Sequence, residues 1–205
     1  HIPDLNKRGQ IYRIISNYGK VHYFAFSSIS RYLRVELLNR HNGIFKTMKK
    51  IKNPWLHEPG YNCICCGPEN PVGLHLEFWE DGEDVLTKWT PTQNYQGWID
   101  TLHGGIQSML LDEVAGWVVT RKLQTTGVTS SMEVKYLKPV STRDKELVIR
   151  ARLTRQMRNV AFIEGEIYNS NGEVCTKATL VYFCASKQKA EEMGFRGCEL
   201  EEGAK

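Results

Sequence analysis

Several classes of protein are excluded by what this sequence of 205 residues lacks. No run approaches the roughly 18 apolar residues of a membrane-spanning helix, so we expect no membrane partner. Neither a Gly-x-Gly-x-x-Gly sequence nor a phosphate-loop motif occurs, so nothing indicates a nucleotide-binding fold. Internal repeats and low-complexity tracts are also missing. What is present, 41% hydrophobic and 24% charged residues, is a globular composition with enough apolar material for a core.

A strongly basic balance is lacking over most of the chain. The formal net charge is +4, but residues 1–47 carry eight Lys and Arg against two acidic residues. Residues 48–205 carry a net charge of −2. The basic character therefore belongs to the first quarter, and the rest gives no electrostatic reason to expect a nucleic-acid partner.

Residues 1–47 are interpreted as an N-terminal extension. The chain begins with His1, whereas Met48, followed by Lys49 and Lys50, is typical of a natural start. Three interpretations stay open: an upstream leader or added sequence, an acid-poor transit peptide, or a short helical appendage over residues 27–38. We expect one folded domain over residues 48–190 and an acidic, frayed tail over residues 191–205.

The pattern after residue 60 predicts six strands and one long helix. Leu74, Leu76 and Phe78 alternate on one side of the first strand, and Asp81-Gly82 is typical of a hairpin turn. The strands are expected at 74–80, 84–90, 128–137, 146–154, 160–168 and 174–183, the helix at 104–122, a loop at 91–102 and a short helix at 187–193. This β-β-α-β-β-β-β order favours an α+β fold, with an antiparallel six-stranded sheet packed on one central helix.

The start of the long helix holds two adjacent glycines, Gly104 and Gly105. Each glycine costs about 1 kcal/mol of helix propensity relative to alanine. In return another group can approach the backbone closely, and the free N–H groups with the helix dipole suit an anion or a developing oxyanion. The alternative is a tight turn that needs glycine only for its dihedral angles.

Asp112 is the candidate catalytic carboxylate within this helix, and the adjacent Glu113 is the competing one. His103 and Asp112 are nine residues apart, which corresponds to ~13.5 Å of rise and roughly half a turn on one helix. A single helix therefore cannot direct both groups at one reacting atom. If they act together, a second copy of the helix must supply one half, so we predict a site at a two-fold interface.

These motifs resemble those of hotdog-fold thioesterases of the phenylacetate-degradation (PaaI-like) type. The resemblance covers about residues 60–185. Its motifs are CGPENPVGL at 66–74, YQGW at 95–98, His103-Gly104-Gly105, Leu111-Asp112-Glu113 and YLKP at 136–139. The expected order of strands agrees with the hotdog fold, in which the sheet wraps around the central helix.

The resemblance implies hydrolysis of an acyl-CoA thioester by a homodimer or a dimer of dimers. The N–H of Gly104 or Gly105 would polarise the carbonyl, supported by His103, and Asp112 of the partner subunit would act as general base or as nucleophile. A hotdog hydratase or dehydratase is the alternative enzyme, which the double glycine disfavours. A non-catalytic acyl-CoA-binding protein stays open, because Gly97 stands where many family members carry Asn.

Further residues are expected to contact the substrate. Gln96 or Asn94 would replace the missing Asn, Trp98 would border the acyl pocket, and Thr129 and Ser130 resemble the hydroxyl residues that some relatives place near the water. The other candidates are basic side chains that either cradle the CoA phosphates or form a solvated sheet face, namely Arg150, Arg152 and Arg158.

The six cysteines favour reduced thiols and a cytoplasmic location over a disulfide framework. Three of them cluster at Cys63, Cys65 and Cys66. A zinc site needs about four ligands, and neither a second Cys-x-x-Cys nor a His-x-x-x-His sequence follows. We therefore expect no metal and no cofactor.

Overall fold

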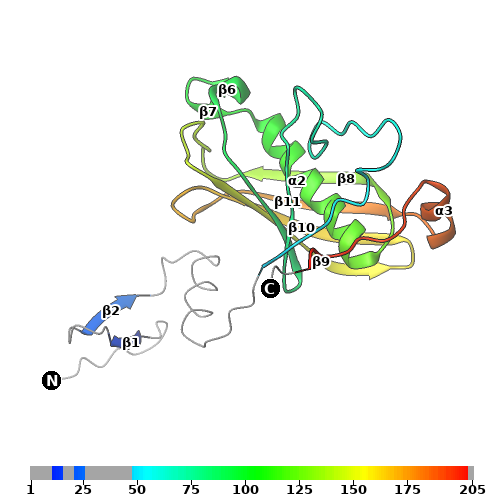
Figure 1. The fold of residues 1–205 in the computed structure, drawn as a ribbon. Helices are drawn as coiled ribbons and strands as arrows, with labels where there is room; N and C mark the ends of the chain where they lie inside the picture. Colours follow the sequence, from blue (N-terminus) through cyan, green and yellow to red (C-terminus); the bar gives the residue numbers. More distant parts are fainter. Residues whose placement is uncertain (1–10, 16–20, 26–47, 203–205) are drawn as a thin grey trace. The chain divides into compact units, whose positions relative to one another are not determined.

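The computed structural model describes residues 11–15, 21–25 and 48–202, and the chain divides into two units, His1–Phe45 and Lys46–Lys205 (Figure 1). In the first unit, β1 (Ile11–Ile15) pairs antiparallel with β2 (Val21–Ala25). The sequence pattern predicted no strand there. The possible helix over residues 27–38 lies outside the described residues.

The second unit is built on an antiparallel sheet with the order β3-β4-β5-β9-β10-β11-β8 (Figure 1). All six predicted strands are present. A two-residue strand before them adds a seventh at one edge, and β8 forms the other edge. The bounds are Lys49–Lys50 (β3), Trp79–Asp81 (β4), Asp84–Trp89 (β5), Gly127–Tyr136 (β8), Leu147–Met157 (β9), Val160–Tyr168 (β10) and Val174–Cys184 (β11).

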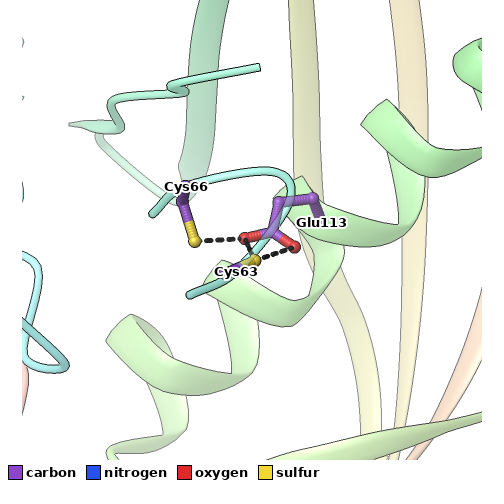
Figure 2. Close-up of side chains that lie close together, drawn as sticks. All are labelled: Cys63, Cys66 and Glu113. Carbon is purple, nitrogen blue, oxygen red and sulfur yellow. Dashed lines mark hydrogen bonds between the residues drawn. The ribbon is translucent and has the colours of Figure 1, made fainter. Parts of the chain in front are cut away.

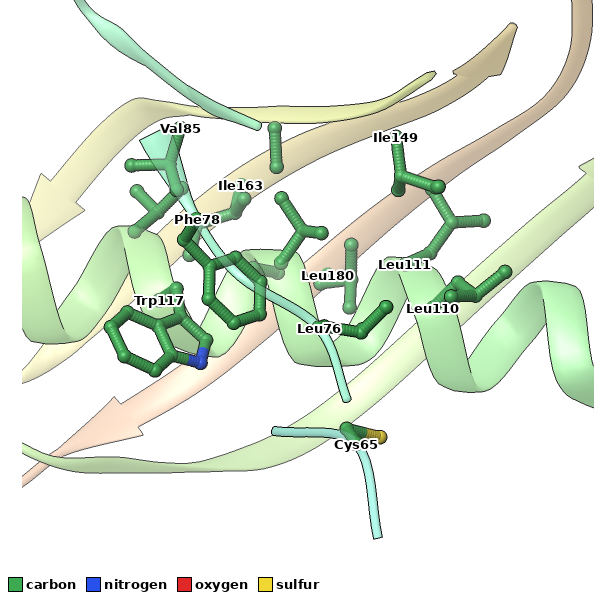
Figure 3. Packing of buried hydrophobic residues seen from close by; sticks show 14 of the residues in the cluster. Cys65, Leu76, Phe78, Val85, Leu110, Leu111, Trp117, Ile149, Ile163 and Leu180 are labelled. Atoms are coloured by element: carbon green, nitrogen blue, oxygen red, sulfur yellow. The ribbon is translucent and has the colours of Figure 1, made fainter. Parts of the chain in front are cut away.

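The predicted helix is α2 (Gly104–Val118), which continues as one π-helical turn, η3 (Val119–Leu123). It packs against the inner face of the sheet and forms the core with it (Figure 3). Gly165 permits this packing, because a Cβ there would lie only 3.0 Å from Cδ2 of Leu111. On another side of the helix, Phe78 stacks on Trp117 with ring centroids 4.2 Å apart. The predicted α+β arrangement is confirmed.

The segment before β4 differs from the predicted strand. Leu74, Leu76 and Phe78 are buried in alternation as expected, but ladder pairing begins only at Trp79. The N–H groups of Leu74 and Leu76 donate instead to the carbonyls of Ile64 and Cys65. The cysteine-rich segment 61–67, called the entry loop below, is therefore held to this extended strip by backbone hydrogen bonds.

The loop before the helix also holds short elements: a 3-10 turn, η2 (Gln93–Tyr95), and a small hairpin of β6 (Gln96–Trp98) and β7 (Thr101–Leu102). After β11, helix α3 spans Lys187–Glu192. Residues 193–202 beyond it are not frayed as expected. Phe195 and Cys198 are buried, and Leu200 bridges to Ile51, because apolar side chains interrupt the acidic ones there.

No helix among the described residues is long and apolar enough to cross a membrane.

Candidate active site

His103 caps the start of α2. Its backbone N–H donates to the carbonyl of Tyr95 at 2.9 Å, which ties the helix start to the preceding loop. Its ring Nδ1 accepts from the N–H of Gly105 at 2.9 Å. One of the two expected oxyanion donors is therefore already used within the chain. The N–H of Gly104 donates to no residue that the structure describes, so it is the donor that stays available for a ligand.

The glycines around His103 make room for aromatic rings. A Cβ at Gly104 would lie 3.2 Å from Cζ of Tyr136, and one at Gly105 would lie 3.0 Å from Nδ1 of His103. A Cβ at Gly97 would lie 2.9 Å from Cδ2 of His103. An Asn at position 97 would therefore require the histidine to shift.

Asp112 lies further along α2 and is held by two hydroxyl groups. Its Oδ1 accepts from Oγ1 of Thr129 at 2.6 Å and from the hydroxyl of Tyr182 at 2.8 Å. The Tyr182 hydroxyl also lies 2.7 Å from the backbone oxygen of Asp112. The other carboxylate oxygen, Oδ2, accepts no hydrogen bond from a described residue. One oxygen is thus anchored while the other is open to water or substrate.

Tyr182 was missed by the sequence analysis. It is buried on the helix-facing side of β11, and burial raises the pKa of its phenol above the ordinary value of 10.0, so it stays a hydrogen-bond donor. Its ring packs beside Gly116, where a Cβ would make an ordinary van der Waals contact of 3.5 Å with the tyrosine oxygen. The alternation of buried residues along β11 was the available signal, but it does not reveal the partner 70 residues away.

A β-bulge brings Thr129 to this carboxylate. Val181 pairs with Ser131 and Tyr182 with Thr129, so Ser130 is the extra residue on β8. The bulge places Thr129 opposite Tyr182, and both hydroxyls reach Asp112. Ser130 itself is exposed and has no contact with Asp112.

Glu113 turns to the entry loop instead. Its Oε1 accepts from Sγ of Cys66 at 2.7 Å (Figure 2). The same oxygen accepts from Nε1 of Trp117 at 3.0 Å. Sγ of Cys63 lies 3.9 Å from the same oxygen. Burial raises the pKa of the Glu113 carboxyl above its ordinary value. The two neighbouring carboxylates of α2 thus have separate surroundings.

The arginines expected to bind phosphate are not gathered at Asp112. Arg150 makes ion pairs with Asp81 and Asp84, the latter at 2.9 Å between Nε and Oδ2. Ala151 faces α2, so alternation along β9 puts Arg150 and Arg152 on the opposite face of the sheet. This arrangement favours a structural role for Arg150. Arg158 is exposed at the turn after β9.

The remaining predicted residues lie on the segment that leads into the helix. Asn94 and Gln96 are exposed beside the helix start. Trp98 is 76% exposed and the adjacent Ile99 is 72% exposed. These large apolar side chains lack cover within one chain, as expected of residues that border a ligand or a second protomer.

Comparison with known proteins shows similarity to thioesterases. Residues 100–176 match the family model of the thioesterase superfamily. A threonine-to-alanine mutant of a hypothetical thioesterase from Streptococcus pneumoniae TIGR4 is 25% identical, with a TM-score of 0.51 over 55% of this chain and 91% of that chain. No protein of curated function matches the sequence.

Two further solved structures share the fold. The PaaI protein of the Escherichia coli phenylacetic acid degradation operon is 18% identical, with a TM-score of 0.51 over 55% of this chain and 81% of that chain. A thioesterase from Haemophilus influenzae is also 18% identical, with a TM-score of 0.53 over 59% of this chain and 85% of that chain. This chain therefore has the hotdog fold, and residues 100–176 are similar to the thioesterase superfamily.

Proposed function

We propose that this protein hydrolyses acyl-CoA thioesters and that Asp112 is its catalytic carboxylate. The observation that carries the proposal is the state of that side chain, with Oδ1 anchored by Thr129 and Tyr182 and Oδ2 open. A carboxylate fixed in this way, in a domain similar to the thioesterase superfamily, suits attack on a thioester. The CoA part of the substrate rests on the PaaI-like resemblance.

In the proposed reaction, Oδ2 of Asp112 takes a proton from a water molecule while the water oxygen attacks the thioester carbonyl. The C–S bond then breaks, and the CoA thiolate leaves and is protonated. In the alternative course, Oδ2 attacks the carbonyl itself, the C–S bond breaks and the CoA thiolate leaves, and water then hydrolyses the resulting mixed anhydride. The N–H of Gly104, at the positive end of α2, stabilises the oxyanion, and a donor of this kind is typically worth ~10²–10³ in rate.

A complete site requires two protomers. His103 and Asp112 lie on one helix, ~13.5 Å apart in rise, so the Gly104 end must come from a second copy. We therefore propose a homodimer with two sites, or a tetramer of two such dimers. The exposed edge strand β8 and the uncovered Trp98 and Ile99 support a second copy at this side of the domain.

The proposed roles of the surrounding residues rest on where they lie relative to Asp112 and to the start of α2. Trp98 borders the acyl chain, and Asn94 and Gln96 beside the helix start orient the carbonyl or the water. Thr129 positions Asp112. Arg152 and Arg158 are the candidate basic side chains left to meet the CoA phosphates, since Arg150 is paired with carboxylates.

The decisive experiment compares wild type with Asp112→Asn in an assay of free thiol released from a panel of acyl-CoAs. We expect wild type to turn over at least one of them and the variant to lose about 10²–10⁴-fold in kcat, because the amide cannot accept the proton. Asp144→Asn is the matched control, since Asp144 also accepts hydrogen bonds but lies outside α2. Acyl-CoA binding without turnover in wild type would instead show a non-catalytic binding protein.

The shared site has its own test. Chains carrying Asp112→Asn and chains carrying Gly104→Val, each inactive alone, are unfolded, mixed and refolded together. Because each mixed dimer keeps one intact site, we expect about a quarter of wild-type activity from a statistical mixture. No recovery in mixtures proven to contain heterodimers would refute a site built across the interface.

A further inference from the structure

The entry loop and helix α2 bring thiols and a carboxylate together outside the proposed active site. Cys63 and Cys66 come from the loop, and Glu113 comes from the helix about 50 residues later (Figure 2). One ligand atom from each of the three residues lies within 4.8 Å of the others. From the sequence alone the cysteine cluster lacks a further ligand, and the fold supplies the carboxylate.

The loop is shaped to present both thiols on one side. Cys63 and Cys66 have the Cys-x-x-Cys spacing that offers two thiolates to a single ion. The N–H of Gly67 closes the turn on the carbonyl of Cys63 at 2.9 Å. Gly67 is required in this turn, because a Cβ there would lie 2.6 Å from that oxygen.

Each of the three groups also has an outer hydrogen-bond partner. The N–H of Cys65 donates to Sγ of Cys63 at 3.3 Å, and the hydroxyl of Tyr61 lies 2.9 Å from Sγ of Cys66. The indole N–H of Trp117 donates to Glu113 at 3.0 Å. Such second partners orient the ligands of metal sites and tune their affinity.

The cluster has donor atoms for a metal ion, but no described basic side chain pairs with its carboxylate. All six cysteines are free thiols, and no Lys, Arg or His of the described residues makes an ion pair with Glu113. A half-buried carboxylate without a charged partner is disfavoured, and a bound divalent ion would supply the missing charge. Thiolates together with one carboxylate suit zinc, which is borderline-soft and tetrahedral, better than magnesium or calcium.

We propose that Cys63, Cys66 and Glu113 bind one zinc-type ion that fastens the entry loop to α2. Its role is structural, and a water molecule would complete the tetrahedral coordination. The site lies one residue along the helix from Asp112, so the ion would stiffen the part of α2 that carries the catalytic carboxylate.

The test uses the full chain, reduced and stripped with a chelator, and titrates it with Co²⁺ and then with Zn²⁺. We expect one ion per chain, a thiolate-to-cobalt charge-transfer band that zinc abolishes, and a higher Tm in the presence of zinc. These measurements need no variant and no enzymatic activity. They are therefore independent of the proposed hydrolase function.

Two variants locate the site. Cys63→Ser removes the less buried of the two cysteine ligands, so it disturbs packing little, and we expect it to weaken binding by more than about 100-fold. Cys175→Ser is the control, because Sγ of Cys175 donates to the carbonyl of Glu173 and a serine hydroxyl keeps that bond. Its affinity should equal that of wild type.

Three results would overturn the metal site. The first is stripped wild type that takes up no stoichiometric ion. The second is cobalt binding without a thiolate band or unaffected by Cys63→Ser. The third is a Cys63–Cys66 disulfide as the sole reaction of the pair, with no metal bound by the reduced chain.

Discussion

The anchoring of Asp112 can be tested by removing one oxygen atom, in the variant Tyr182→Phe. The tyrosine hydroxyl is buried and contacts Oδ1 of Asp112 at 2.8 Å and its backbone oxygen at 2.7 Å. Phenylalanine keeps the ring and its packing on Gly116. The variant therefore removes hydrogen bonding to Asp112 with little change of volume.

The expected loss of stability follows from the proton count. A phenol has a single proton, so its two acceptors share one bond rather than receiving one each. A hydrogen bond to a charged group is worth about 1.5–3 kcal/mol, and this is the predicted decrease in the free energy of unfolding. For a chain of this size, that corresponds to a Tm lower by about 3–12 °C.

The catalytic effect should be separate from the loss of stability. Thr129 still holds Oδ1, so we expect Asp112 to be misplaced rather than freed, with kcat lower by about tenfold and KM unchanged. Tyr168→Phe is the matched control, because Tyr168 is equally buried and also donates to a carboxylate, that of Glu166. It should lose stability and keep kcat.

The comparison is made below the Tm of both variants, with thiol release for activity and thermal unfolding for stability. Wild-type kcat in folded Tyr182→Phe would refute the positioning role. So would an equal loss of kcat in Tyr168→Phe, because activity would then follow stability alone.

Two further predictions concern the loop before α2 and the end of that helix. Gly97→Asn should lower both stability and turnover rather than restore the family contact, because its Cβ would come within 2.9 Å of His103; higher activity would contradict this. Glu80→Gln should lower the free energy of unfolding at pH 7 by about 1–3 kcal/mol, because the side chain bonds Lys122 and Arg121 at 2.8 and 3.0 Å. Burial would raise the pKa of Glu80, but these two cations lower it below 4.5, so the stabilisation is present above that pH and is lost as the pH falls through the folded pKa. The difference between wild type and variant should therefore shrink in acid unfolding curves below pH 4.5, and a constant difference would refute it.

Local patterns in the sequence were sufficient for most of the fold. The alternation of Leu74, Leu76 and Phe78 correctly predicted which residues face the core, although the ladder begins only at Trp79. The periodicity of burial shows which side chains face the core, but a strand also needs a hydrogen-bonded neighbouring strand. In this segment the entry loop takes the hydrogen bonds that such a strand would make. The hairpin of β6 and β7 was missed because strands of two or three residues are too short to show a period.

Local sequence patterns also do not reveal the ion-pair partners of charged residues. The spacing of Arg150 and Arg152 correctly placed them on one face of a strand. It contained no information on Asp81 and Asp84, which β4 and β5 bring to Arg150. The neutralising partners of a basic side chain depend on which strands become neighbours, and that is a property of the whole sheet.

By itself, the sequence determined the order of the elements, the α+β architecture and a helix that begins at two glycines and carries Asp112, because these depend on periodicity and on backbone preferences within a few residues. Only the tertiary structure decided what each carboxylate of α2 meets. Tyr182 reaches Asp112 across 70 residues, and Cys66 reaches Glu113 across 47. The contact at Asp112 depends on sheet register and on the bulge at Ser130. The contact at Glu113 depends on the path of the entry loop. These features arise when distant segments pack together, so no local pattern encodes them.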